Sequence, residues 1–103
     1  MLKTGRSASA EEVQAAALEI GVKALTFIAG DPEQMERFLA LTGIKVGQVR
    51  AASRDPAFFA GLLDFLLGHE PTLIAFASEA GLSPASVGAA RDRLSGAFEA
   101  APR

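Results

Sequence analysis

The chain contains no cysteine, tryptophan or tyrosine, and His69 is its one histidine. Without cysteine, disulfide bonds and thiolate chemistry are excluded. One histidine among scattered carboxylates makes a poor metal site and a poor catalytic centre. The ten glycines stand one at a time, so there is no glycine-rich loop to hold a phosphate. These absences predict a protein that is not an enzyme, with no catalytic residues, metal or cofactor.

The chain also lacks an excess of charge of one sign and a long apolar run. Ten basic residues oppose twelve acidic ones, which gives a net charge of -2. A balanced surface lacks the positive field that nucleic acids require. No uncharged apolar run approaches about 18 residues, and three glutamates between positions 11 and 19 interrupt the stretch where a secretory signal would lie. We therefore expect a soluble, cytoplasmic protein that does not contact membranes.

What the sequence does contain is a series of helix signals. Ser9 followed by Glu12 forms a capping box, and an aspartate-proline pair precedes two later segments. Further prolines and single glycines mark the remaining starts and ends. The predicted helices span residues 10–29, 32–42, 46–52, 56–67, 71–80 and 84–95, the third weakened by Gly47.

No segment shows the alternating pattern of a strand, so the fold class is all-α. We expect a compact orthogonal bundle of five or six short helices. Residues 9–98 form a single helical domain, flanked by a disordered N-terminal tail at 1–8 and a frayed C-terminus at 99–103.

The segment 56–67 has the broadest apolar surface. At about 100° per residue its large apolar side chains spread over about 200° of the helix, so it needs neighbours on both sides and should form the centre. Its large apolar residues are Phe58, Phe59, Leu62, Leu63, Phe65, Leu66 and Leu67. Replacing Leu63 or Leu66 by alanine should cost about 2–5 kcal/mol of unfolding free energy, which thermal melts would measure. In the first helix the expected apolar side consists of Val13, Ala17, Leu18, Ile20, Leu25, Phe27 and Ile28.

The remaining arc of segment 56–67 holds Ala57, Ala60, Gly61 and Asp64. Asp64 can simply lie on a solvent-facing strip. Alternatively, the four residues line a shallow groove for another helix or a second subunit, because small side chains permit close approach. A carboxylate in such a groove would select a cationic partner. We treat these four residues as a candidate interaction surface.

A pattern between Phe38 and Ala52 returns 38 positions later. Each copy consists of the end of a helix, a glycine stop, an aliphatic residue and a second helix, which resembles a helix-turn-helix. The matching residues are Phe38, Gly43, Ile44, Val49, Ala51 and Ala52, then Phe76, Gly81, Leu82, Val87, Ala89 and Ala90. Any two helices that cross at a tight turn share such packing residues, so the pattern establishes neither DNA binding nor a duplication.

DNA reading depends instead on the outward side chains of the second helix. In the later copy these are Ser83, Ala85, Ser86, Gly88, Ala89 and Asp92, and none has the reach of Arg, Lys, Asn or Gln. The nearby cations are Arg91 and Arg93. The earlier copy offers Lys45, Arg50 and Arg54. A DNA-binding regulator that uses these five residues is the alternative function, and nucleic acid is a disfavoured partner.

His69 follows Gly68, at the predicted end of segment 56–67. The expected role of its ring is to complement the exposed carbonyls at that helix terminus. A catalytic pair with Asp64 or Glu70 is the less favoured alternative.

Three segments of the chain are distinctive when taken together: DPEQMERFLALTGI, DPAFFAGLLDFLLG and FASEAGLSPASVGAAR. Together they resemble a bacterial family of small proteins, domain of unknown function 3572, and the resemblance covers roughly Glu11 to Gly96. It implies a helical fold and a bacterial cytosolic origin, and it assigns no functional residues. The sequence therefore predicts a non-enzymatic protein-interaction or adaptor module, whose partner is another protein or a second copy of the chain.

Overall fold

The computed structural model describes residues 9–99, and side chains up to Ser95. The predicted tail at 1–8 and residues 100–103 of the predicted frayed end lie outside the described residues. The helices are α1 (Ala10–Ala29), α2 (Pro32–Thr42), α3 (Val49–Ala52), α4 (Pro56–Leu67), α5 (Glu70–Ala80) and α6 (Pro84–Glu99), with a single 3-10 turn, η1 (Val46–Gln48), before α3. Residues 9–99 contain no strand.

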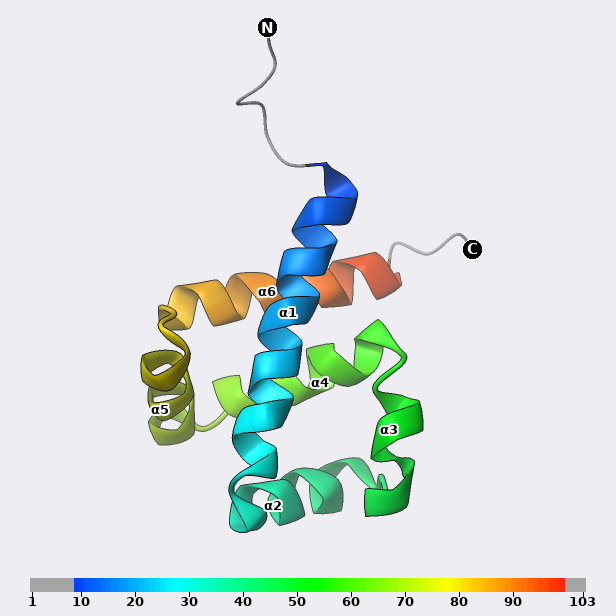
Figure 1. Cartoon of the computed structure of the whole chain (residues 1–103), viewed down its shortest axis with the longest axis vertical. Coiled ribbons are helices and arrows are strands. Elements are labelled where there is room, and N and C mark those ends of the chain that lie inside the picture. The colour runs from blue at the N-terminus through cyan, green and yellow to red at the C-terminus, as the bar shows by residue number, and fades with distance from the viewer. Residues whose placement is uncertain (1–8, 100–103) are drawn as a thin grey trace, which may run out of the picture.

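The helices cross at steep angles, as expected of an orthogonal bundle. Helix α1 passes over both α4 and α6 and contacts them, while α2, α3 and α5 surround this centre (Figure 1). The chain bends by 115° between α1 and α2 and by 113° between α4 and α5. The predicted all-α bundle is confirmed.

Local caps explain why the helices begin where they do. The Ser9 hydroxyl accepts the Glu12 backbone N–H at 3.1 Å, and the Glu12 carboxylate accepts the Ser9 N–H at 3.0 Å. The carboxylates of Asp31 and Asp55 accept the backbone N–H groups at the starts of α2 and α4. Each interaction satisfies a backbone donor that has no partner within the helix. Three predicted bounds differ from the structure. The third helix begins at Val49, because residues 46–48 form the 3-10 turn η1, α5 begins at Glu70, and α6 continues to Glu99.

Helix α4 lies at the centre, as its wide apolar surface predicted. Leu62, Leu63 and Leu66 are fully buried, and α4 contacts both α1 and α6. The rest of the core comes from one to three buried side chains of each other long helix, among them Ile28, Phe38, Phe76, Val87 and Leu94.

The buried face of α1 differs from the predicted one. It consists of Ala17, Gly21, Ala24 and Ile28, whereas Leu18, Ile20, Leu25 and Phe27 are only partly buried beside it. A Cβ atom on Gly21 would lie 2.9 Å from the Cβ of Phe59. Glycine is therefore needed at this position, because α1 approaches α4 too closely for any side chain. The larger residues pack along the two sides of this contact.

Phenylalanines attach the outer helices to the core. The ring centroid of Phe38 in α2 lies 5.7 Å from that of Phe58 and 5.6 Å from that of Phe65, and both contacts are edge to face. Phe76 of α5 lies 5.4 Å from Phe27 of α1. Such geometries are favoured between aromatic rings. One phenylalanine thus holds each of α2 and α5 against the centre.

Candidate interaction groove

The four residues predicted as an interaction surface on α4 do not share one exposed face. Gly61 and Asp64 are exposed, but Ala57 is half-buried and Ala60 is only 7% exposed. Asp64 already has a cationic partner within the chain. Arg91 of α6 donates from Nε to Asp64 Oδ1 at 2.7 Å and from Nη2 to Oδ2 at 3.3 Å. The helix that contacts α4 beside Asp64 is therefore α6 of the same molecule.

The five cations of the DNA-binding alternative lie on separate elements. Lys45, Arg50 and Arg54 are exposed around η1 and α3, whereas Arg91 and Arg93 belong to α6. Arg91 also donates to Asp92 at 3.2 Å, and these hydrogen bonds, chiefly the one with Asp64, raise the pKa of its guanidinium. Its charge is thus matched by two carboxylates. Helix α3 has only four residues, too few to lie along a major groove.

His69 does not take the expected role. Its backbone N–H donates to the Leu66 carbonyl at 3.1 Å, but its ring lies at the start of α5 and its Nδ1 hydrogen-bonds to the hydroxyl of Thr72. The ring thus satisfies a side chain that is only 7% exposed, and the carbonyls at the end of α4 are left to backbone donors. Among the described side chains, no three His, Cys, Asp or Glu residues are close enough to hold a metal ion.

The structure reveals an apolar groove that the sequence reasoning missed. It is an open cleft of about 560 Å³ between the end of α1, one face of α2 and the turn η1. Its apolar lining consists of Ala29, Pro32, Met35, Leu39 and Val46. We call this cleft the α2 groove. Glu33 and Glu36 complete its lining, which contains no lysine or arginine.

The helical geometry of α2 orders this lining. At about 100° per residue, Pro32, Met35 and Leu39 fall within about 60° of one another. Glu36 and then Glu33 follow on one side of that apolar strip, so the acidic groups form one rim. Met35 and Leu39 pack partly against the core, which fixes the floor of the groove.

Val46 forms the opposite wall because of the turn after α2. Gly43 has a left-handed backbone with φ of 76°, which reverses the chain at the end of α2. The half-buried Ile44 follows, and η1 then presents Val46 with 75% of its surface exposed. The sequence contained one signal of this groove wall: the aliphatic Val46 stands beside Gly47 in the short segment 46–52, which is too short to bury it.

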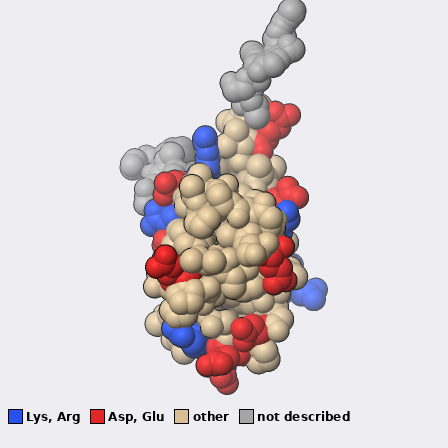
Figure 2. All heavy atoms as spheres, turned by 90° about the vertical axis from the view of Figure 1, so that its left-hand side faces the viewer, with Lys and Arg blue, Asp and Glu red and all other residues tan. Residues whose placement is uncertain are grey.

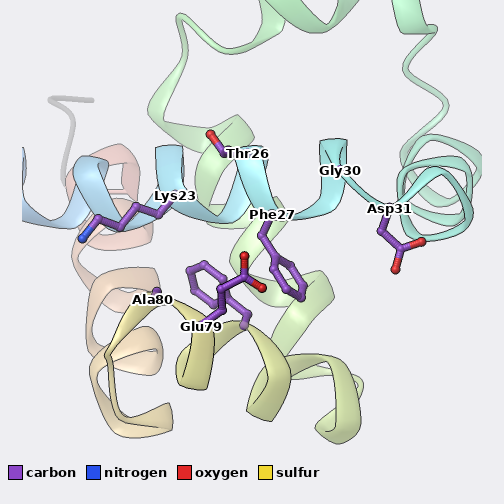
Figure 3. A pocket seen from close by; sticks show the side chains of 8 residues that line it. Lys23, Thr26, Phe27, Gly30, Asp31, Glu79 and Ala80 are labelled. Atoms are coloured by element: carbon purple, nitrogen blue, oxygen red, sulfur yellow. The ribbon is translucent and has the colours of Figure 1, made fainter.

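A second cleft, of about 460 Å³, lies between α1 and α5. Phe27 and Phe76 are among its lining residues. The carboxylate of Glu79 points across the cleft from α5, while Lys23 extends along α1 (Figure 3). Its rings belong to the core contact between α1 and α5, and its charges are of both signs. The second cleft therefore indicates the charge of a partner less clearly than the α2 groove, whose charged lining residues are both acidic.

The outer side of α5 is a third candidate surface. Figure 2 views the molecule from this side, and the charged residues lie mainly at the margins of the face. Ile74 of α5 is 51% exposed and has small neighbours, Ala75 and Ser78. These residues line neither of the two clefts described above, so the α2 groove is the better candidate site.

Within residues 9–99, no helix is by itself both long and apolar enough to span a bilayer. Two sharply bent pairs, α1 with α2 and α4 with α5, reach that length and composition only when taken together.

The fold and the groove define a small all-helical protein with an open, mainly apolar cleft beside α2. Residues 14–97 match the family described as "Protein of unknown function (DUF3572)". The match covers most of the chain, so the chain belongs to this family. No curated protein matches the chain. No solved structure matches it either.

Proposed function

We propose that this protein is a non-enzymatic protein-interaction module, and that it binds a segment of its partner in the α2 groove. The observation that carries the proposal is the 75% exposure of Val46 beside an open cleft with apolar lining. Single exposed aliphatic residues are common on protein surfaces. A concave apolar cleft that has such a residue in its wall is typical of a binding site.

Burial of apolar surface would drive this binding. Each square ångström of apolar area removed from water contributes about 25 cal/mol. Met35 and Leu39 are held by the core on one side, so their exposed parts lose little freedom when a partner covers them. The proposal needs no catalytic step, metal or cofactor, and it assumes a cytoplasmic protein.

The test is affinity capture from the native host with three forms of the protein. Val46→Asn makes the groove wall polar without adding charge. Val22→Asn is the matched control, because Val22 of α1 is 50% exposed and does not line the groove. We expect the wild type and Val22→Asn to retain the same protein and Val46→Asn to lose it. Equal capture by all three forms, or capture of nothing, would contradict the proposal.

The DNA-binding alternative has weaker support. It depends on Lys45, Arg50 and Arg54, which are exposed but stand beside a helix of four residues. A gel-shift assay with random duplex at low salt, where phosphate contacts are strongest, compares the two functions. We expect no shift. A shift that disappears in the double variant Arg50→Ala/Arg54→Ala would favour the regulator.

A further inference from the structure

We infer that the α2 groove receives a cationic amphipathic helix. This inference rests on the proposed function and specifies its partner. It follows from the shape of the groove, the side chains that line it and the sign of the charge on its rim.

The elements around the groove favour a helix over other peptide conformations. An extended peptide that adds a strand requires a sheet edge, and residues 9–99 contain no strand. A proline-rich segment requires an aromatic-lined groove, and this lining has no aromatic residue. A phosphorylated segment requires an arginine cluster, whereas this lining has carboxylates. A helix that lays its apolar face into an aliphatic groove satisfies all three observations.

The spacing of the lining fits such a helix. Pro32, Met35 and Leu39 form a strip along α2, and Val46 faces them from η1. A partner helix with apolar residues at positions i, i+3 or i+4, and i+7 presents a strip of the same kind. Methionine and leucine adapt readily to the side chains they meet.

The rim determines the charge of the partner. Glu33 and Glu36 lie three residues apart on one edge of α2, and both are exposed. Neither forms an ion pair within the described residues. Arg37 follows Glu36 in the sequence and Lys45 precedes Val46, but neither cation lines the groove. Lysine or arginine on the flank of the bound helix would meet two carboxylates, whereas an acidic flank would be repelled.

The test uses two fluorescent synthetic peptides of equal length. Both place leucine on one helical face, and the other face carries lysine in one peptide and glutamate in the other. Binding is followed by fluorescence anisotropy. We expect the leucine/lysine peptide to bind at least about tenfold more tightly than the leucine/glutamate peptide, because opposite and like charges face the same rim. A scrambled leucine/lysine peptide, which lacks an apolar face, should bind weakly.

Three variants assign this binding to the groove. Val46→Asn should weaken binding of the leucine/lysine peptide, and Glu33→Gln/Glu36→Gln should weaken it by about tenfold, since rim charges each contribute severalfold. The charge control is Glu11→Gln/Glu19→Gln, which removes the same charge from exposed positions of α1 outside the groove. It should leave the affinity unchanged. Circular dichroism should show that all variants melt as the wild type does.

The outcomes separate this inference from the proposed function. If both peptides bind equally and Val46→Asn weakens both, the groove binds helices but the charge preference is wrong. If neither peptide binds while a host protein is still captured through Val46, the helical occupant is wrong and the interaction module stands. Groove-dependent capture of a second copy of the chain would likewise replace the cationic helix. Binding unaffected by any groove variant would overturn the inference.

Discussion

The corner from Phe38 to Ala52 and the corner from Phe76 to Ala90 begin alike and then diverge. In both, the leading phenylalanine is 1% exposed. Both then reverse at a left-handed glycine, with φ of 76° at Gly43 and 71° at Gly81. We call residues 38–52 the first corner and residues 76–90 the second corner.

The difference begins after the glycine. In the second corner, α6 runs across the centre of the molecule and buries Val87 completely. In the first corner, a 3-10 turn and the four-residue α3 stay at the edge, and Val49 is only half-buried (Figure 1). The second corner continues along α6 to the fully buried Leu94. The equivalent position in the first corner, 38 residues earlier, is Pro56, where α4 already begins, so α3 has no counterpart of Leu94.

The turn and the helix after it are therefore specified separately. Phenylalanine and glycine produce the corner, because one anchors the helix and the other permits positive φ. Whether the next helix reaches the core depends on the residues that follow. The first corner ends too early to cover its own apolar residues, and the exposed Val46 and the α2 groove are the consequence.

The largest expected effect concerns the two anchoring phenylalanines. Phe38→Ala and Phe76→Ala should each lower the unfolding free energy by about 3–5 kcal/mol, because both rings are equally buried and truncation leaves a cavity. Urea unfolding measures both. Phe38→Leu and Phe76→Leu serve where the alanine variants do not fold. A small loss for Phe38 alone would mean that the first corner is not anchored as the second is.

The next effect should separate the corners. Val87→Ala should cost about 2–3 kcal/mol, because Val87 is fully buried and its methyl groups leave a void. Val49→Ala, at the equivalent but half-buried position, should cost about 1 kcal/mol or less. Urea unfolding of the two variants gives the difference directly. Equal losses would show that α3 is packed as firmly as α6.

The two turn glycines should again behave alike. An added Cβ at Gly43 or Gly81 would meet no atom within 4 Å, so only backbone strain opposes a side chain. Gly43→Ala and Gly81→Ala should each cost about 1–2 kcal/mol, the penalty of a left-handed conformation for alanine. Thermal melts followed by circular dichroism test this. A neutral substitution at either position would show that its turn can relax to another conformation.

The sequence predicted the features that depend on neighbouring residues. The caps at Ser9, Asp31 and Asp55 act within one turn, so the starts of α1, α2 and α4 follow from them directly. The central place of α4 followed from an apolar surface too wide for one partner. These inferences need only helical geometry and the chemistry of backbone donors.

The features that were missed depend on which helices meet. The face of α1 was predicted from its large residues, but the contact with Phe59 places Gly21 at its middle. Asp64 was predicted to lie on a solvent-facing strip or, alternatively, in a groove for a cationic partner. It is exposed, and Arg91, 27 residues away in the same chain, supplies the cation. The α2 groove combines α1, α2 and η1. No local pattern contains that information, because each case requires the tertiary crossing of segments distant in sequence.

The smallest expected effect would make the first corner more like the second. Gly47 stands 38 positions before Ala85, and a Cβ added at Gly47 would meet no atom within 4 Å. Because its φ is not positive, Gly47→Ala should favour helical structure and raise the unfolding free energy by about 0.5–1 kcal/mol. Ala85→Gly is the matched control and should lower it by a similar amount or less, since Ala85 lies in the first turn of α6. Urea unfolding of both variants measures these changes. A loss of stability in Gly47→Ala would mean that η1 needs glycine for a reason other than its φ. The 3-10 turn before α3 would then contribute to the stability of the fold.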